Sequence, residues 1–158
     1  MKICIDGNDG TGKSTLISLL KKLMPEHEYQ DRGLPSALTV GESADPADIY
    51  IILTCSVDVS TKRLKSAGRD MTEHWHLPET LEKYNKMFVD LAKKHGWKLI
   101  DSSGTIEKLL DLVVVEVKKH GKSSLLGPLM CEKLQIVIEL KWRAFLLEAL
   151  NTNNGCKS

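Results

Sequence analysis

The 158-residue sequence has no large excess of charge of either sign, no long apolar run and no clustered cysteines. Lys and Arg number 22 against 21 Asp and Glu, so no strong overall field draws the chain to nucleic acid or acidic membranes. Any anion that it binds must therefore be held by a local site. No apolar signal segment begins the sequence, and no stretch approaches about 18 uncharged apolar residues. We therefore expect a soluble, cytoplasmic protein with no membrane partner.

The cysteines exclude two further classes. Cys4, Cys55, Cys131 and Cys156 show neither Cys-x-x-Cys spacing nor a neighbouring His cluster, which argues against a zinc site and a disulfide framework. Hydrophobic residues make up 42% of the chain, enough to bury a core and too many for global disorder. The length fits one domain with a short appendage.

Short apolar runs alternate with helical repeats over residues 1–120. We expect strands at 3–5, 27–32, 49–55 and 97–101, and helices at 16–23, 57–68, 78–96 and 106–117. Residues 36–47 are expected to form a loop with at most one helical turn. The run 49–55 is almost continuously apolar, which is typical of a central parallel strand buried on both faces. The alternation predicts a three-layer α/β fold with a mostly parallel central sheet.

The pattern changes after residue 120. We expect residues 121–158 to be a linker and an amphipathic helical tail, separate from the domain of residues 1–120. The apolar stripe of this tail is Leu134, Val137, Ile138, Trp142, Phe145 and Leu146. Such a helix would pack on the domain or on a second copy in a homodimer. A helix on a membrane surface is the alternative, which the acidic residues between the apolar positions disfavour.

One motif carries phosphate chemistry. Residues 7–14 read G-N-D-G-T-G-K-S, which satisfies G-x-x-x-x-G-K-[ST] between a predicted strand and a predicted helix. Backbone N–H groups of such a loop point at phosphate oxygens, and the helix adds its positive N-terminal end. Lys13 is expected to reach the β and γ phosphates, and the Ser14 hydroxyl to bind Mg²⁺. The predicted nucleotide-binding residues of the loop are Gly7, Asn8, Asp9, Gly10, Thr11, Gly12, Lys13, Ser14 and Thr15.

Two charged residues end the second predicted strand. In an open α/β sheet the carboxyl ends of the strands surround the ligand, so Asp31 and Arg32 are candidates for the acceptor side. Asp31 is predicted to orient or deprotonate an acceptor hydroxyl, or to be an outer Mg²⁺ ligand, and Arg32 to clamp an acceptor or transferred phosphate. A solvated turn with a surface ion pair is the alternative.

A basic segment follows the third strand. Arg63 and Arg69 flank the end of a predicted helix, followed by polar residues up to His76, which is the composition of a lid that brings arginine to a γ-phosphate. Basic residues that merely complement a helix C-terminus are the alternative. Further along, Asp101 either borders the nucleotide base or caps the next helix. The aromatic Tyr84 and Phe88 fall on a helical stripe and are expected in the core.

These segments resemble the thymidylate kinase family of nucleoside monophosphate kinases. The likeness covers about residues 1–120 and rests on the phosphate loop with Asp6 before it, on Asp31-Arg32 with Ser36, and on Arg69-Asp70 with Glu73. The resemblance implies transfer of the γ-phosphate of ATP, with Mg²⁺, to a (deoxy)nucleoside monophosphate such as thymidylate. Some members carry a basic residue inside the loop, where this chain has Gly10. The catalytic set that we predict is Lys13, Asp31, Arg32, Arg63 and Arg69.

The acceptor side departs from that family. Pro25 and Asp31 are almost adjacent, whereas family members usually have a long segment there that carries part of the monophosphate site. This leaves a polynucleotide or modified-base DNA kinase of the same fold as an alternative, with nucleic acid as acceptor. A P-loop switch protein is another, although no clear Asp-x-x-Gly motif follows the third strand. The sequence does not decide between acceptors, between ATP and GTP, or between oligomeric states.

Overall fold

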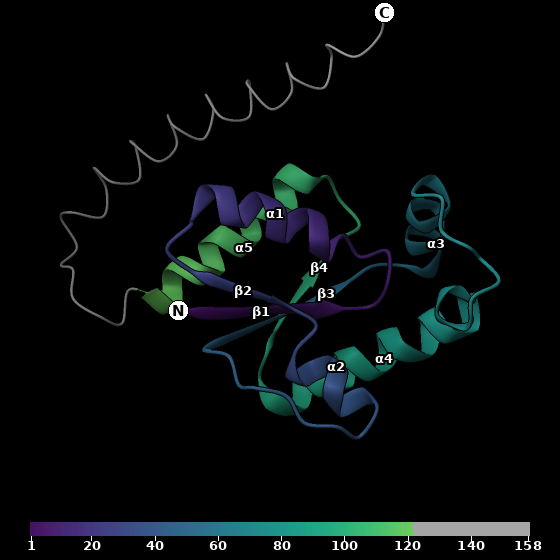
Figure 1. Ribbon diagram of the computed structural model, residues 1–158, viewed down its shortest axis with the longest axis horizontal. Coiled ribbons are helices and arrows are strands. Elements are labelled where there is room, and N and C mark those ends of the chain that lie inside the picture. Colours follow the sequence, from purple (N-terminus) through teal and green to yellow (C-terminus); the bar gives the residue numbers. More distant parts are fainter. Residues whose placement is uncertain (122–158) are drawn as a thin grey trace, which may run out of the picture. The chain divides into compact units, whose positions relative to one another are not determined.

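The computed structural model of the protein describes residues 1–121, of which Met1–His120 form one compact unit (Figure 1). The linker and amphipathic helix expected within residues 121–158 lie outside the described residues apart from Gly121, which ends a helix. The division at residue 120 therefore stays a prediction. Among the described helices, none is both long and apolar enough to cross a membrane.

Four parallel strands form the central sheet in the order β2-β1-β3-β4. They are β1 (Lys2–Gly7), β2 (Glu28–Asp31), β3 (Ile49–Thr54) and β4 (Lys98–Asp101). The chain passes from β1 outward to β2 and then crosses β1 to reach β3. The carboxyl ends of β1 and β3 therefore flank the point at which the strand order reverses, which is where open α/β sheets bind ligands. The predicted parallel sheet is confirmed.

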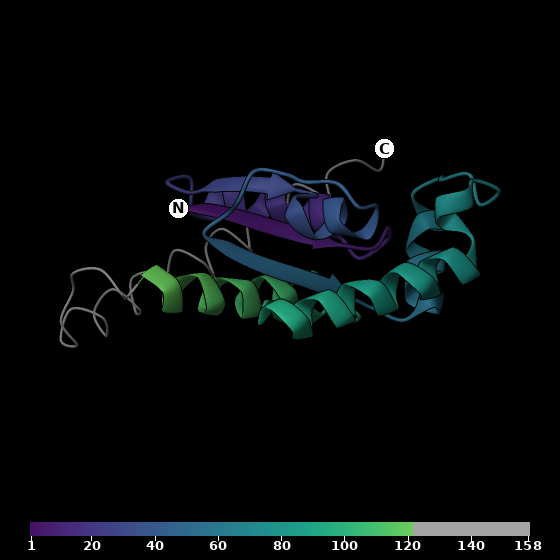
Figure 2. The same cartoon turned by 90° about the horizontal axis from the view of Figure 1, so that it is seen from below.

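Helices cover both faces of the sheet and complete three layers (Figure 1). On one face lie α1 (Lys13–Leu23) and α5 (Ile106–Gly121), and on the other lie α2 (Leu34–Thr39) and α4 (Pro78–His95). Beyond the carboxyl ends of the strands lies α3 (Val57–Ser66), which the short η1 (His74–His76) separates from α4. Figure 2 shows α4 extending past the sheet toward α3 and η1.

Local signals explain most helix boundaries. Pro78 occupies the first turn of α4, and Gly96 ends this helix in the left-handed conformation with φ 69°. The Ser56 hydroxyl caps α3 by accepting a hydrogen bond from the Val59 N–H at 3.3 Å. The first turn of α5 is capped by Thr105, whose hydroxyl accepts from the Lys108 N–H at 3.4 Å. These helices confirm the predicted ones within a few residues.

The α2 helix was only partly expected. The sequence predicts a loop from residue 36 with at most one helical turn, whereas α2 begins at Leu34 with Pro35 in its first turn. The buried Asp6 carboxylate of β1 accepts hydrogen bonds from the N–H groups of Gly33 and Ser36 at 3.0 and 2.8 Å. Because these contacts satisfy N-terminal donors of α2 from a distant strand, local sequence does not reveal them.

The core fills the space between the layers. Ile51 and Leu53 of β3 are fully buried, as the continuous apolar run predicts. Phe88 of α4 packs with Ile52 and Ala92, and the partly buried Tyr84 lies against this cluster. The expectation of a core position is therefore confirmed for Phe88, whereas Tyr84 is only partly buried at the edge of the core.

Candidate functional site

The loop between β1 and α1 has a conformation that its glycines require. Gly7, Gly10 and Gly12 all have positive φ values, of 138°, 77° and 91°. A Cβ atom on Gly7 would overlap the Leu53 carbonyl oxygen, and one on Gly10 would lie 2.8 Å from the Ser60 carbonyl oxygen. The loop can therefore pass close to β3 and α3 only where these positions lack side chains.

Lys13 opens α1 and lies at the floor of the loop. Its side chain is almost fully buried, and its Nζ donates hydrogen bonds to the carbonyl oxygens of Gly7 at 2.7 Å and Asn8 at 2.8 Å. Burial lowers the pKa of the Lys13 ammonium, while the Asp9 carboxylate, 3.9 Å away, opposes that change. The ammonium is thus held within the loop whose backbone would cradle phosphate oxygens.

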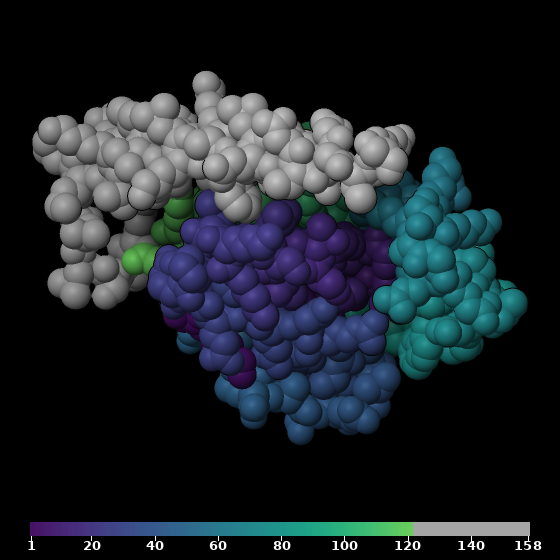
Figure 3. All heavy atoms as spheres, turned by 45° about the horizontal axis from the view of Figure 1, so that its top comes forward, coloured from purple at the N-terminus to yellow at the C-terminus, as the bar shows by residue number. Residues whose placement is uncertain are grey.

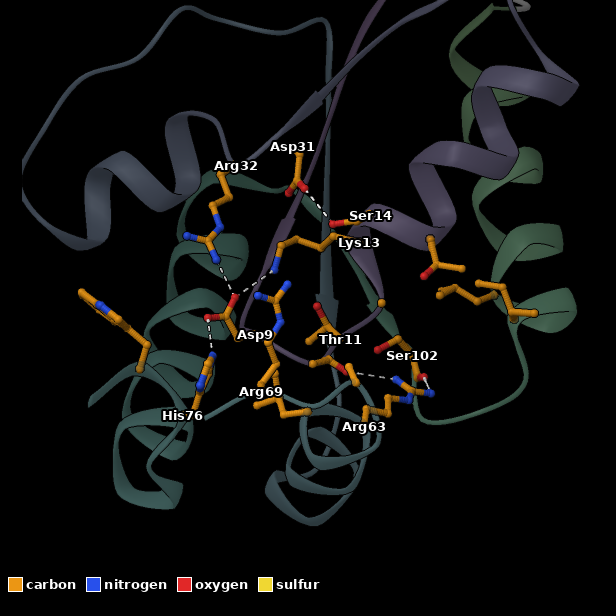
Figure 4. A pocket seen from close by; sticks show the side chains of 18 of the residues that line it. Asp9, Thr11, Lys13, Ser14, Asp31, Arg32, Arg63, Arg69, His76 and Ser102 are labelled. Atoms are coloured by element: carbon orange, nitrogen blue, oxygen red, sulfur yellow. Dashed lines mark hydrogen bonds and ion pairs between the residues drawn. The ribbon is translucent and has the colours of Figure 1, made fainter. Parts of the chain in front are cut away.

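A cavity of about 620 Å³ opens in front of this loop, and we call it the donor cavity. The loop, the end of β2, α3 and the segment 67–77 between α3 and α4 contribute to its walls (Figure 4). In the space-filling view, the purple N-terminal residues lie between the blue residues around α2 and the teal residues of α3 and η1 (Figure 3). The side chains of the cavity therefore come from segments far apart in the sequence.

Ser14 and Asp31 meet at this cavity. The Ser14 hydroxyl donates a hydrogen bond to the Asp31 carboxylate at 3.2 Å, and both side chains line the donor cavity. Within residues 1–121, no three His, Cys, Asp or Glu side chains gather to hold a metal by themselves. A hydroxyl with one carboxylate is instead the oxygen donor set that suits Mg²⁺ shared with substrate phosphates. The two residues therefore fit the predicted metal role.

Asp9 connects three parts of the site. Its carboxylate pairs with the Arg32 guanidinium and lies 3.9 Å from Lys13 Nζ and 3.8 Å from His76 Nε2. The imidazole of His76 is itself held by the Asp70 carbonyl oxygen, 2.6 Å from Nδ1. Asp9 thus joins the loop to the end of β2 and to η1. The sequence analysis placed Asp9 only among the nucleotide-binding residues. Its position four residues before Lys13 was the one sequence signal for the contact between Asp9 and Lys13.

Arg32 is held in an unusual backbone conformation. With φ 56°, it is the one non-glycine residue of positive φ within residues 1–121. The fully buried Asp6 carboxylate fixes the following turn through Gly33 and Ser36 and also accepts from the Ser36 hydroxyl at 2.6 Å and the Gly7 N–H at 2.8 Å. One carboxylate therefore positions both the start of the phosphate loop and the turn that carries Arg32.

The two predicted lid arginines have different surroundings. Arg63 donates to the carbonyl oxygens of Ser102 at 2.7 Å, Gly104 at 3.3 Å and Gly10 at 3.4 Å. Its guanidinium braces the loop against the β4–α5 connection, and its predicted role at a γ-phosphate stays a prediction. Arg69 instead points into the middle of the donor cavity, between Asp9 and Thr11 (Figure 4).

Asp101 does not line the donor cavity, although Ser102 and Gly104 do. Hydrogen bonding from the Ser103 side chain, together with the Ser103 N–H at 2.8 Å, holds the pKa of the Asp101 carboxyl below its usual range. Ser102 turns inward because both its N–H and its hydroxyl donate to the Thr54 carbonyl oxygen. Thr105, and not Asp101, is the residue that caps α5. The expected place of Asp101 beside the nucleotide base stays a prediction.

A second cavity of about 380 Å³ adjoins the first, and we call it the acceptor-side cavity. Both cavities are lined by Asp9, Arg32 and Trp75. The rings of Trp75 and Tyr84 lie 5.4 Å apart at 59° and form an aromatic wall. The sequence did not single out Trp75 for this wall, because its position follows from the fold of η1 against α4.

The chain is similar to a known protein family and to a known fungal protein. Residues 1–151 match the family described as KAP family P-loop domain. The chain is 28% identical over 145 residues to the bifunctional cordycepin biosynthesis cluster protein 3 of the fungus Cordyceps militaris. That match covers 73% of this chain and 16% of the fungal protein, so the chain spans only a small part of this relative.

Solved structures of deoxyadenosine kinase from M. mycoides share the fold. The form with dCMP and a flexible dCDP bound gives a TM-score of 0.62 at 17% identity, over 75% of this chain and 99% of the kinase chain. The dCTP-bound form also gives 0.62, at 15% identity over 75% and 100% of the two chains. The predicted α/β P-loop fold is thereby confirmed. The likeness is to a kinase-like P-loop fold and not to the thymidylate kinase family in particular.

Proposed function

The chain belongs to the KAP family of P-loop domains, and we propose that it is a phosphotransferase that moves the γ-phosphate of ATP to a nucleoside-type acceptor. The acceptor class comprises (deoxy)nucleosides and their monophosphates, with thymidylate as the acceptor that the sequence resemblance suggests. The observation that carries this proposal is the pair of adjoining cavities, which share Asp9, Arg32 and Trp75. A protein that only bound or hydrolysed a nucleotide would not require the second cavity.

The donor cavity offers the groups that hold a nucleotide triphosphate. The loop N–H groups and the N-terminus of α1 bind phosphate oxygens, and Lys13 places a cation among them. Ser14 and Asp31 would hold Mg²⁺, which neutralises phosphate charge when it is bound. Arg69, which extends into the cavity, is suited to stabilise the charge of the transferred group. Catalysis by such a site consists mainly of positioning and charge stabilisation.

The relatives support the nucleoside-type acceptor. The fungal relative is named for cordycepin biosynthesis, and the solved M. mycoides kinases were captured with dCMP, dCTP or dATP. On the acceptor side, the aromatic wall of Trp75 and Tyr84 is suited to the face of a nucleobase, and Arg32 projects between the two cavities. These features together favour a small acceptor of the nucleoside class.

The test is Mg²⁺-dependent transfer of labelled γ-phosphate from ATP to a panel of nucleosides, their 5′-monophosphates including dTMP, and single- and double-stranded DNA. Transfer to a nucleoside or a monophosphate supports the proposal. Transfer to DNA alone would favour the polynucleotide kinase alternative, for which strong salt dependence of binding is expected. Binding of ATP or GTP with slow hydrolysis that no acceptor changes would refute a phosphotransferase and favour a switch. The Lys13→Ala variant is the control for contaminating kinases.

A further inference from the structure

We infer that the acceptor is an uncharged nucleoside, phosphorylated on a hydroxyl group, and not a nucleoside monophosphate. This inference rests on the proposed phosphotransferase function and narrows it. Its basis is the distribution of charge around the two cavities.

The acceptor-side cavity is poor in positive charge. Among the described residues that line it, Asp9 and Glu42 are acidic and Arg32 alone is basic. The Arg32 guanidinium is already paired with the Asp9 carboxylate. A phosphate monoester brings a charge of about −1.5 to −2 at pH 7 into such a site. It would therefore meet the Asp9–Arg32 ion pair and the Glu42 carboxylate, with no unpaired cation in the described lining, which is an unfavourable environment for an anion.

The other cations of the site are committed to the donor side. Lys13 and Arg69 line the donor cavity and are absent from the described lining of the acceptor-side cavity. Arg63 is bonded to three backbone carbonyl oxygens. When ATP occupies the donor cavity, its phosphates take up the remaining cations. Among the described residues that line the two cavities, no unpaired cation is then left to compensate a second, acceptor phosphate.

The shared wall is suited to a hydroxyl acceptor. Asp9 lines both cavities, so its carboxylate lies where donor and acceptor would meet. In the transfer, the acceptor oxygen bonds to the γ-phosphorus, and the bond from that phosphorus to the β,γ-bridging oxygen breaks to release ADP. The hydroxyl proton passes to the Asp9 carboxylate and then to solvent. A monophosphate oxygen is already ionised, so it has no proton to give to a carboxylate at this position.

The aromatic wall of the acceptor-side cavity suits an uncharged ring. Trp75 and Tyr84 present aromatic faces, and Phe88 of the core contributes to the same wall. Stacking on such faces binds a nucleobase without any charge. Binding energy for the acceptor would therefore come from its base and its sugar hydroxyls.

The experiment compares each nucleoside with its own 5′-monophosphate, as matched pairs of adenosine and AMP, cytidine and CMP, thymidine and dTMP, and their deoxy or ribo counterparts. We expect kcat/KM for the best nucleoside to exceed that of its monophosphate by at least about 100-fold, as like charges at a binding site require. A monophosphate that equals or exceeds its nucleoside would overturn the inference and leave the phosphotransferase proposal standing. ATP binding without transfer to any compound would overturn both.

A variant that removes one cavity carboxylate tests whether charge causes the preference for a nucleoside over its monophosphate. Glu42→Gln removes one of the two cavity carboxylates, and we expect the ratio of kcat/KM for nucleoside over monophosphate to fall about 3- to 10-fold. Asp45→Asn is the matched control, because it removes the same charge from the same loop at a residue outside the described cavity lining, and its ratio should not change. An unchanged ratio in Glu42→Gln, or an equal fall in Asp45→Asn, would refute the electrostatic reason for the preference.

Discussion

The most informative single substitution is Asp6→Asn. The Asp6 side chain is fully buried, and its two carboxylate oxygens accept hydrogen bonds from the N–H groups of Gly7, Gly33 and Ser36 and from the Ser36 hydroxyl. An asparagine of the same shape replaces one acceptor oxygen by an amide group that only donates. Either orientation of the amide then leaves at least one backbone N–H facing another donor.

The expected magnitude follows from these contacts. A buried N–H without an acceptor costs about 1–3 kcal/mol, and the remaining hydrogen bonds lose the strengthening that a charged acceptor provides. We therefore expect Asp6→Asn to lower the free energy of unfolding by about 2–4 kcal/mol. That is a large share of the roughly 5–15 kcal/mol that is typical of a domain. Because Asp6 also holds the turn behind Arg32, phosphotransfer should fall as well.

Urea unfolding followed by circular dichroism measures the change. The matched control is Asp48→Asn, because the Asp48 carboxylate also accepts from a β1 N–H group, that of Lys2 at 2.7 Å, but in an exposed position. Water can replace that partner, so we expect a loss below about 1 kcal/mol. If the two variants lost equal stability, or if Asp6→Asn lost less than about 1 kcal/mol, the role assigned to the buried carboxylate would be refuted.

Three further predictions concern the site and one buried thiol. Arg69→Ala should lower kcat by about 100-fold or more with little change in ATP affinity, since Arg69 extends into the cavity; unchanged turnover would contradict its role. Arg63→Ala should instead weaken ATP binding about 10-fold, measured by calorimetry, because it releases the Gly10, Ser102 and Gly104 carbonyls that Arg63 braces; a pure kcat effect would contradict this. Burial, with the charge of Asp6, raises the pKa of the Cys4 thiol from 9.0 to about 12, so the folded protein keeps it protonated while the unfolded chain ionises. The contribution of Cys4 to the free energy of unfolding is therefore complete below pH 9.0 and falls as pH rises toward about 12, and thiol reagents at pH 9.0 should label Cys4 only after denaturation, as peptide mass spectrometry would show.

Features with a local cause could be predicted from the sequence. The apolar run of β3 indicates a strand buried on both faces, and Pro78 and Gly96 mark the ends of α4. The phosphate loop is recognisable because its positive φ values favour glycine, which stands at Gly7, Gly10 and Gly12. The steric limits of the backbone therefore relate this conformation directly to the residue type. The alternation of strands and helices then suffices for a parallel sheet with the loop at its carboxyl edge.

Features that depend on contacts between residues far apart in the sequence could not be predicted from the sequence. The start of α2 depends on Asp6, and the bracing role of Arg63 depends on carbonyl groups about 40 and 50 residues away along the chain. The position of Asp101 outside the donor cavity depends on how Ser102 bonds to Thr54. Residue types alone do not specify such partners, since a carboxylate or a guanidinium can satisfy its hydrogen bonds in many ways.

The sequence by itself determined the phosphate-loop motif and its place between strand and helix, because a glycine loop has a conformation set by its own residues. Only the tertiary structure decided what faces that loop. It brings Asp9, Arg32 and Trp75 to the wall between two cavities, and it commits Arg63 to the backbone while Arg69 reaches inward. Those positions follow from the packing of η1, α3 and the end of β2 against the loop, which is a property of the whole fold and not of any one segment.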